Sequence, residues 1–518
     1  KARETYKDNL ILLDNGDILQ GQPTAYYYNY IDTVSLHVTA DMLNFMGYDA
    51  ANMGNHDVET GRAVFDRWAG DCRAPVLGAN IIDTATGEPH FRPYKVLERD
   101  GVKIAVLGMI TPAIPVWLSE NLWRGLRFDD MEETARKWMK IIREKERPDI
   151  VIGMFHAGQD ALLMGGKYRE NASLDVARNV PGFDIVLMGH DHARECKKVQ
   201  NVAGDSVVMD PASNGIVVSD IDITVTLRNG KVTDKQIDGV LTETAPYGIS
   251  GEFMKRFSPQ YATIQDFVSK RIGRFTKTVS TRPAYFGSSA FIDLIHTLQL
   301  DISGAEISLA APLSYDTQIK EGDIYVYDMF NLYKYENMLY TMKLSGKEVR
   351  DALEMSYDLW TNRMTSPDDH ILLLRDQPRE GAADRAAFKN FSFNFDSAAG
   401  IIYTVDVTKP CGSKVTILSM ADGTPFHMDK MYTVALNSYR GNGGGELLTK
   451  GAGISQDELK ERIISSTDKD LRYYLMQYIE QKKVIEPRAL GQWKFIPEEW
   501  AVPASKRDYE FLFGTNRN

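Results

Sequence analysis

Four short apolar runs in the first 192 residues each end in a residue type that binds metal ions. Runs of this length that are closed by glycine or turn residues are typical of buried strands. In an α/β sheet, ligands bind outside the carboxyl ends of the strands, so the residues after these runs are expected to meet at one edge. The runs, each with the residues that follow, are 10–13 with Asp14 to Asp17, 50–53 with Gly54 to Asp57, 150–155 with His156, and 185–188 with Gly189 to His192.

The residues at this predicted edge suit divalent cations. Asp17 offers a carboxylate that can bridge two ions, and Asn55 offers a neutral oxygen. Three histidines add imidazole nitrogens, namely His156, His190 and His192. A mixed set of oxygen and nitrogen ligands favours hydrolysis, because two ions about 3.5–4 Å apart activate a water and clamp the oxygens of a phosphoryl group. One histidine at a strand end is ordinary, but a ligand after every run indicates a metal site.

In order and spacing, these segments resemble the later signature blocks of the calcineurin-like metallophosphoesterases. Segments 80–117 and 437–445 are similar to the bacterial two-domain 5'-nucleotidase group, and above all to its 2',3'-cyclic-nucleotide 2'-phosphodiesterase/3'-nucleotidase branch. The resemblance covers nearly the whole chain. It implies an α/β fold, in which a metallophosphoesterase α/β sandwich is joined by a long helix to a C-terminal α/β domain of the 5'-nucleotidase type.

The resemblance assigns metal ligands residue by residue. Asp17 would bridge two divalent ions, which would be Zn, Mn, Co or Fe. Asn55, His156 and His190 would complete one site, and His192 would belong to the other. The family opens this domain with a strand ending in Asp-x-His, which supplies two further ligands to the second site, and no Asp-x-His precedes Asp17. We therefore expect that about the first forty residues of the domain are absent and that the second site is incomplete.

A catalytic histidine is also implied by the resemblance. His56, next to the ligand Asn55, would stabilise charge on the phosphoryl oxygens or help the leaving group. Relatives often orient this histidine with an aspartate three residues later, where this chain has Glu59. The longer glutamate could still accept the imidazole N–H. Asp14 could bond to the turn backbone, and Asp191 could either orient a neighbouring ligand or be solvated.

Two tyrosines in the C-terminal part match positions where the family stacks a nucleobase. They are Tyr335 and Tyr439. Stacking on aromatic rings is worth about 1–3 kcal/mol per base and tolerates any base. Asn337 could bond to the base edge, and Arg440 could reach a ribose or phosphate or form an exposed salt bridge. The alternative is that each tyrosine is an ordinary core residue.

The chain is long enough for more than one domain, because 518 residues exceed the size at which a single core stops growing. Segment 220–227 alternates in polarity, and Asn229-Gly230 and the return at Lys231 predict a closing hairpin. A helical pattern follows, with apolar residues at Phe253, Phe257, Tyr261, Ile264, Phe267, Val268 and Ile272. We expect a phosphoesterase domain at 1–243, a helix and linker at 244–279, and a C-terminal nucleotide-binding domain at 280–518.

Composition limits the partners. The net charge is −11 and no long basic run is present, which argues against polymeric nucleic acid. Three scattered cysteines form no disulfide framework. No stretch approaches the roughly 20 apolar residues of a membrane span. The resemblance implies a small nucleotide substrate and export to the periplasm or cell surface, and the oligomeric state stays open.

The implied reaction is metal-dependent opening of nucleoside 2',3'-cyclic phosphates, followed by removal of the 3'-phosphate. A 5'-nucleotidase is the nearest alternative. That branch carries arginines early in the second domain, and segments 285–289 and 311–316 contain none, which favours the cyclic-nucleotide branch. From another class, the chain could be a nucleotide-binding module without catalysis, because one metal site is incomplete.

Overall fold

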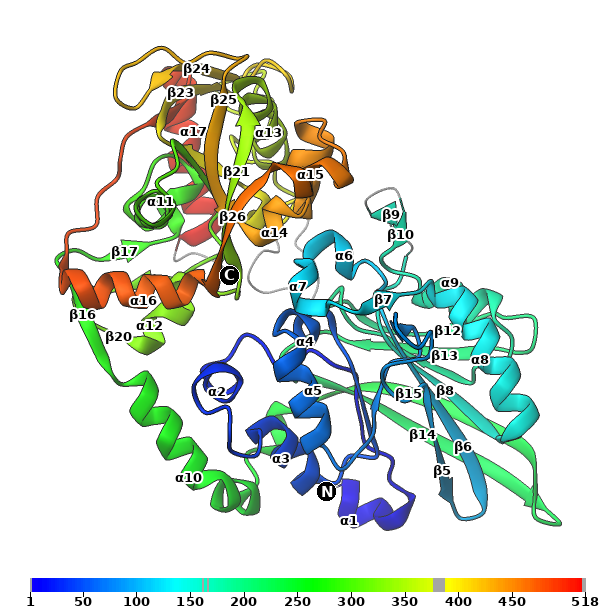
Figure 1. The fold of residues 1–518 in the computed structure, drawn as a ribbon. Helices are drawn as coiled ribbons and strands as arrows, with labels where there is room; N and C mark the ends of the chain where they lie inside the picture. Colours follow the sequence, from blue (N-terminus) through cyan, green and yellow to red (C-terminus); the bar gives the residue numbers. More distant parts are fainter. Residues whose placement is uncertain (1, 161–162, 165–166, 376–386, 515–518) are drawn as a thin grey trace. The chain divides into compact units, whose positions relative to one another are not determined.

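A computed structural model describes residues 2–160, 163–164, 167–375 and 387–514. The chain divides into two compact units, Lys1–Ala262 and Thr263–Asn518 (Figure 1). The division falls within the long helix α10 (Gly251–Val268). The predicted domain limits at 243 and 280 therefore stay predictions, although α10 does lie in the segment predicted to link the domains.

The first unit is built on two sheets. Its smaller sheet is parallel and consists of β1 (Leu13–Asp14), β2 (Ala50–Asn52) and β3 (Val76–Leu77). Its larger sheet has the order β12-β13-β11-β8-β6-β5, and its four inner strands run parallel. These strands are β5 (Tyr94–Arg99), β6 (Val102–Ile110), β8 (Ile150–His156), β11 (Ile185–Leu187), β12 (Arg194–Val199) and β13 (Ser206–Pro211).

Alternate residues of β6 serve two different cores. Ile104 and Val106 pack with Ala50 and Leu77 of the smaller sheet, so one core lies between the two sheets. The intervening residues of β6 face the opposite way and pack against helices α8 (Met131–Lys145) and α9 (Ser173–Asn179) (Figure 1). This period of two is the geometry of a strand. The arrangement confirms the predicted α/β sandwich.

The predicted hairpin is confirmed. Strands β14 (Val217–Arg228) and β15 (Lys231–Glu243) pair antiparallel. The two turn residues, Asn229 and Gly230, have φ of 53° and 71°, as a type I′ turn requires. In α10, Phe253 and Phe257 pack against the ring of Phe45. The predicted helical face was too long at its end, because Ile272 lies in strand β16 (Arg271–Phe275).

Shorter elements complete the first unit. They are α1 (Ala2–Tyr6), α2 (Pro23–Tyr26), α3 (Val38–Met46), α4 (Asn55–Glu59), α5 (Arg62–Asp71), α6 (Ile114–Trp117), α7 (Glu120–Trp123), β4 (Ile81–Asp83), β7 (Leu126–Phe128), β9 (Leu163–Met164) and β10 (Tyr168–Arg169). None of the helices in the described ranges has the length and apolar character needed to cross a membrane.

The second unit centres on a mixed five-stranded sheet of order β22-β18-β25-β21-β26. Its strands are β18 (Ile307–Ala310), β21 (Met338–Ser345), β22 (Ser397–Ala399), β25 (Met431–Asn437) and β26 (Ile463–Asp470). One large core joins this sheet to helix α13 (Gly346–Trp360) and helix α17 (Glu498–Phe513). Helix α13 begins at a capping box in which Ser345 and Glu348 bond to each other's backbone N–H groups.

Smaller sheets and further helices complete the second unit. The strands are β16, β17 (Val279–Ser280), β19 (Gln318–Ile319), β20 (Gly322–Tyr325), β23 (Ile401–Asp406), β24 (Val415–Met420), β27 (Val484–Ile485) and β28 (Trp493–Ile496). Of these, strands β23, β24 and β28 contribute side chains to the same core. The helices are α11 (Ala290–Ser303), α12 (Val326–Leu332), α14 (Ser438–Gly441), α15 (Gln456–Arg462) and α16 (Leu471–Lys482). The predicted C-terminal α/β domain is thus present.

Candidate metal centre

Four parallel strands of the first unit end at one edge. Strand β8 ends at His156, and β1, β2 and β11 end a few residues before Asp17, Asn55 and His190. The parallel pairing of β1 with β2 and of β8 with β11 places these ends side by side. The structure therefore brings together the four side chains that were predicted to form one metal site.

Short distances join the four side chains. Nε2 of His156 lies 3.1 Å from Oδ2 of Asp17 and 3.1 Å from Oδ1 of Asn55. Nδ1 of His190 lies 2.8 Å from the same oxygen of Asn55. We call Asp17, Asn55, His156 and His190 the four-residue cluster.

In each imidazole, the nitrogen that points away from the cluster bonds to an acceptor, and this bond decides which ring nitrogen carries the proton. Nδ1 of His156 donates to the carbonyl oxygen of Asn15 at 2.7 Å, and Nε2 of His190 donates to Oε1 of Glu170 at 3.0 Å. Because a carbonyl and a carboxylate only accept, the neutral rings present bare nitrogens to the cluster. Those nitrogens face oxygens that are also acceptors. A cation among these atoms resolves the conflict, and the donor set of one carboxylate, one amide oxygen and two imidazoles suits a divalent metal ion.

Titration of the cluster follows the same logic. Burial would raise the pKa of Asp17, yet the neighbouring imidazoles of His156 and His56 hold it well below its usual range. Burial would lower the pKa of His156, but the Asp17 carboxylate raises it. The cluster therefore favours positive charge beside Asp17, which a proton on His156 supplies when a metal ion does not.

The backbone at this edge is held in unusual conformations. Asp17, His190 and His192 have φ of 64°, 76° and 56°, a left-handed region that costs a non-glycine residue of order 1 kcal/mol or more. Asp57 holds the first of these turns, because its carboxylate accepts from the backbone N–H groups of Asp17, Ile18, Leu19 and Gly54 at 2.8–2.9 Å. The sequence prediction missed Asp57, although it lies in the Gly54–Asp57 segment.

A second missed feature is a pair of linked amides at the cluster, of which Asn52 is buried and Asn15 half-buried. Asn52 donates to the carbonyl oxygens of Met109 and Met154 and to Oδ1 of Asn15. Asn15 in turn donates to the carbonyl of Phe155 at 3.0 Å. These bonds tie the ends of the smaller sheet to those of the larger sheet. In the sequence, the signal that could have indicated this role was an asparagine at or just after the end of an apolar run.

His56 and Glu59 form a pair beside the cluster. Nδ1 of His56 lies 2.6 Å from Oε2 of Glu59, which also accepts from the side chain of Gln20 at 2.6 Å. The backbone N–H of His56 donates to Oδ1 of Asp17 at 2.9 Å. The side chain of His56 is 31% exposed, whereas that of Glu59 is 8% exposed. A buried carboxylate thus orients a histidine that solvent can reach.

Two aspartates have structural partners. Oδ1 of Asp14 accepts from the N–H of Gly16 at 3.1 Å, which is the turn interaction expected for it. Asp191 accepts from the N–H groups of Gln159 and Ala193 at 3.0 and 3.1 Å. Asp191 therefore links the loop after His156 to the loop that carries His190, and the alternative of a merely solvated side chain is wrong.

In the second unit, sheet register places the two predicted stacking tyrosines at one edge. Tyr335 comes just before β21 and Tyr439 just after β25, and these strands pair antiparallel with Leu339 opposite Asn437. Both tyrosines are half-buried. The ring of Tyr439 meets the edge of Phe393 at a centroid distance of 6.1 Å.

Arg440 and Asn337 are less accessible than the sequence suggested. Arg440 is 2% exposed and pairs through two N–H groups with Asp396 at 2.8 and 2.9 Å. It also donates to the carbonyls of Phe393 and Gly444. The exposed salt bridge considered for Arg440 is therefore wrong, because the pair is buried. Asn337 is buried, and its carbonyl accepts from the N–H of Leu471 at 2.8 Å.

Two family patterns match this architecture. Residues 1–194 match the calcineurin-like phosphoesterase family, and residues 271–450 match the C-terminal domain family of 5'-nucleotidases. The chain therefore contains a calcineurin-like phosphoesterase domain followed by a 5'-nucleotidase C-terminal domain. The resemblance seen in the sequence is thereby confirmed.

Relatives of this phosphoesterase cover nearly its whole length. It is 27% identical to the trifunctional nucleotide phosphoesterase YfkN of Bacillus subtilis over 94% of the chain, but spans only 36% of that protein. It is also 27% identical to the 2',3'-cyclic-nucleotide 2'-phosphodiesterase/3'-nucleotidase of Salmonella typhimurium, over 96% of this chain and 83% of the relative. A Staphylococcus aureus structure assigned as a 5'-nucleotidase aligns with a TM-score of 0.75 and 20% identity, over 94% of this chain and 90% of that one. At that identity it shows the fold.

His192, which was predicted to belong to a second metal site, is less closely tied to the four-residue cluster. His192 is exposed, and within the described ranges its ring makes no hydrogen bond to the four-residue cluster. Within the described residues, no group of three or more histidine, cysteine, aspartate or glutamate side chains is arranged to hold a metal ion. In the four-residue cluster, His156 contacts Asp17, and His190 is joined to His156 through the shared amide oxygen of Asn55.

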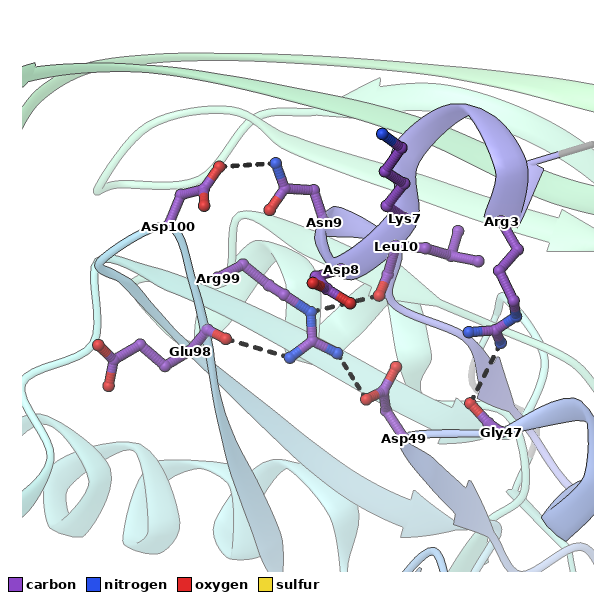
Figure 2. Close-up of a pocket in the computed structure, with 10 residues that line it drawn as sticks. All are labelled: Arg3, Lys7, Asp8, Asn9, Leu10, Gly47, Asp49, Glu98, Arg99 and Asp100. Carbon is purple, nitrogen blue, oxygen red and sulfur yellow. Dashed lines mark hydrogen bonds and ion pairs between the residues drawn. The ribbon is translucent and has the colours of Figure 1, made fainter.

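A pocket of about 300 Å³ lies elsewhere in the phosphoesterase unit (Figure 2). It is lined by residues before β1 and β2 and by the turn between β5 and β6, among them Leu10, Asp49 and Arg99. Because β6 runs parallel to β8, this pocket lies at the opposite strand ends from His156. The guanidinium of Arg99 is engaged by Asp49 and by the carbonyls of Leu10 and Glu98 (Figure 2). The pocket is thus separate from the metal centre.

Proposed function

We propose that this phosphoesterase opens nucleoside 2',3'-cyclic phosphates and then removes the 3'-phosphate, giving nucleoside and phosphate. The four-residue cluster, in which bare imidazole nitrogens face acceptor oxygens, carries the proposal. Relatives named for this pair of reactions align over 95–96% of the chain and support the choice of substrate.

The cluster residues would bind one divalent ion. Asp17, Asn55, His156 and His190 would be its ligands, and His192 with Asp17 would contribute to a second ion, as the family resemblance implies. When bound, such ions polarise phosphoryl oxygens and lower the pKa of water. The carbonyl of Asn15 accepts from Nδ1 of His156, which would leave Nε2 of that ring for ligation.

His56 would act on the phosphoryl group or the leaving oxygen. The Glu59 carboxylate accepts from its Nδ1 and orients the ring, and Nε2 would donate to an oxygen on which charge develops. In the second unit, Tyr335 and Tyr439 would stack the base. The burial of Arg440 and Asn337 supports a role for them in holding these loops, with any contact to the nucleotide remaining a proposal.

A 5'-nucleotidase is the second candidate, favoured by a Vibrio cholerae 5'-nucleotidase that is 30% identical over 38% of this chain. Release of phosphate from 2',3'-cyclic AMP, 3'-AMP and 5'-AMP should be measured with Mn²⁺ or Zn²⁺ added. We expect the cyclic nucleotide and 3'-AMP to be hydrolysed faster than 5'-AMP. Faster release from 5'-AMP would favour the second candidate, and binding without release would favour a nucleotide-binding module.

Asp17→Asn provides the matching metal test. It removes the only anionic ligand of the cluster, so we expect it to lose both bound metal and turnover. Asp234→Asn, at an exposed position of β15, removes the same charge away from the site and should change neither. Elemental analysis after dialysis against free metal measures binding. Equal metal content in wild type and Asp17→Asn would exclude Asp17 as a ligand.

We further propose export to the periplasm or cell surface, as the resemblance implies. Cell fractionation of the native host, followed by immunoblotting for the chain, tests this. Recovery with cytoplasmic markers would contradict it.

A further inference from the structure

One short segment contacts both histidine loops of the metal centre. This segment, 170–173, consists of the connection after β10 and the first residue of α9, Ser173. Oε1 of Glu170 lies 3.0 Å from Nε2 of His190. Oδ1 of Asn171 accepts from the N–H of Gly158 at 2.8 Å, and Ser173 donates to the carbonyl of Ala157 at 2.8 Å. The segment thus braces the backbone after His156 and the ring of His190.

The contact between Glu170 and His190 is largely shielded from water. Their side chains are 16% and 12% exposed. The ring of Trp117 packs against His190 at a centroid distance of 5.3 Å and an interplanar angle of 30°. A shielded bond to a carboxylate has more influence on a ring than an exposed one, because solvent competes less for the donor.

The chemistry of this bond decides which nitrogen of His190 can bind metal. An ionised carboxylate only accepts, so Nε2 carries the proton and Nδ1 keeps its lone pair toward Oδ1 of Asn55. Without Glu170, the ring could place its proton on Nδ1, which would occupy the ligating position.

We propose that Glu170 is a positioning residue that fixes the tautomer and orientation of His190 for a divalent cation. The proposal rests on the proposed function only for the identity of the ligand as a metal ion. Asn171 and Ser173 extend the effect to the neighbouring loop, since they hold the backbone that follows His156. Carboxylates behind ligating histidines typically change metal affinity by about 10- to 100-fold.

The first test is titration of the full chain with Mn²⁺ by calorimetry. We expect Glu170→Ala to weaken the first binding event by about 10- to 100-fold. Glu170→Gln keeps an acceptor oxygen and should recover most of that loss, which also separates positioning from a general folding defect. Glu195→Ala removes an exposed carboxylate paired with Lys197 on β12 and should bind as wild type does. Wild-type affinity in Glu170→Ala would overturn the proposal.

The second test needs no metal. Nitrogen-15 shifts of the His190 ring should show a protonated Nε2 and a bare Nδ1 in wild type and Glu170→Gln, and a mixture in Glu170→Ala. A proton on Nδ1 in the wild-type protein would overturn the role of Glu170. If wild type binds no metal but shows the expected tautomer, the proposed function fails while the positioning by Glu170 stands.

Discussion

Two buried polar clusters of this molecule differ in whether their donors and acceptors balance. In the second unit, Arg440 meets the carboxylate of Asp396 and the carbonyls of Phe393 and Gly444, so every partner of the cation is an acceptor. In the first unit, the four-residue cluster sets two bare imidazole nitrogens against acceptor oxygens. The first arrangement is complete by itself, and the second requires a cation or a proton.

This difference separates structural from functional polar groups. A balanced buried ion pair stabilises the loops it joins and offers nothing to a ligand. An unbalanced set is unfavourable by itself and is kept only where something else binds. The same reasoning assigns Arg440 to the framework around Tyr439 and the four-residue cluster to chemistry.

In the first unit, the strongest test is His56→Ala, beside the four-residue cluster, in the metal-loaded protein. We expect kcat for a 3'-nucleotide to fall by about 10²- to 10⁴-fold with metal content unchanged, because a general acid or charge-stabilising donor is lost. His90→Ala is the matched control, since His90 also pairs with a carboxylate, Asp66, at 2.7 Å. Steady-state kinetics and elemental analysis are both needed. Loss of metal in His56→Ala would make His56 a ligand instead.

Breaking the buried pair of Arg440 and Asp396 should lower the free energy of unfolding. Asp396→Asn leaves the buried guanidinium of Arg440 without its anion, so we expect a loss of about 3–5 kcal/mol in the free energy of unfolding of the second unit. Asp316→Asn breaks a pair of the same geometry, because Arg282 contacts both oxygens of Asp316 at 2.6 and 2.9 Å. That pair is exposed, and its loss should cost at most about 1 kcal/mol. Similar losses in urea denaturation would refute the contrast.

A buried histidine with neutral partners, His296, predicts how the stability of the second unit depends on pH. His296 lies between the hydroxyls of Ser308 and Ser397 at 2.9 and 3.1 Å, and burial lowers its pKa from 6.5 to about 3. The neutral ring is the stable form in the fold, so its contribution is full above pH 6.5 and is lost as pH falls toward 3. Between pH 7 and pH 5 we expect a loss of roughly 2 kcal/mol that His296→Asn does not show.

The control for this pH dependence is His427→Asn, at an exposed position of the same unit. It should retain the wild-type slope of unfolding free energy against pH. If His296→Asn and wild type lose stability in parallel, other groups cause the dependence and His296 is not the buried neutral ring inferred here.

The sequence predicted the strand ends of the metal centre but not the atoms that support it. Short apolar runs closed by glycine or turn residues locate Asp17, Asn55, His156 and His190, because those patterns depend on local backbone geometry. The roles of Asp57 and Asn52 arise from bonds to residues as far as 102 positions away, which no local pattern reports. The exposed salt bridge predicted as an alternative for Arg440 was wrong for the same reason, because its partner Asp396 lies 44 residues earlier.

The tyrosines proposed to stack the base provide the smallest expected effect. Tyr439 lies on the balanced framework, with Phe393 against its edge and Arg440 holding the loop beneath it. Tyr439→Ala should raise KM for a 3'-nucleotide about tenfold, from the loss of about 1–3 kcal/mol of stacking, whereas Tyr439→Phe keeps a ring and should change little. Tyr327→Ala, at an exposed position of α12, is the control for a general loss of tyrosine. Hydrolysis of p-nitrophenyl phosphate, which has no nucleobase, should be unaffected by any of the three. Equal losses for both substrates would mean that Tyr439, like Arg440, supports the fold of the second unit. The nucleoside would then have to be bound by other residues.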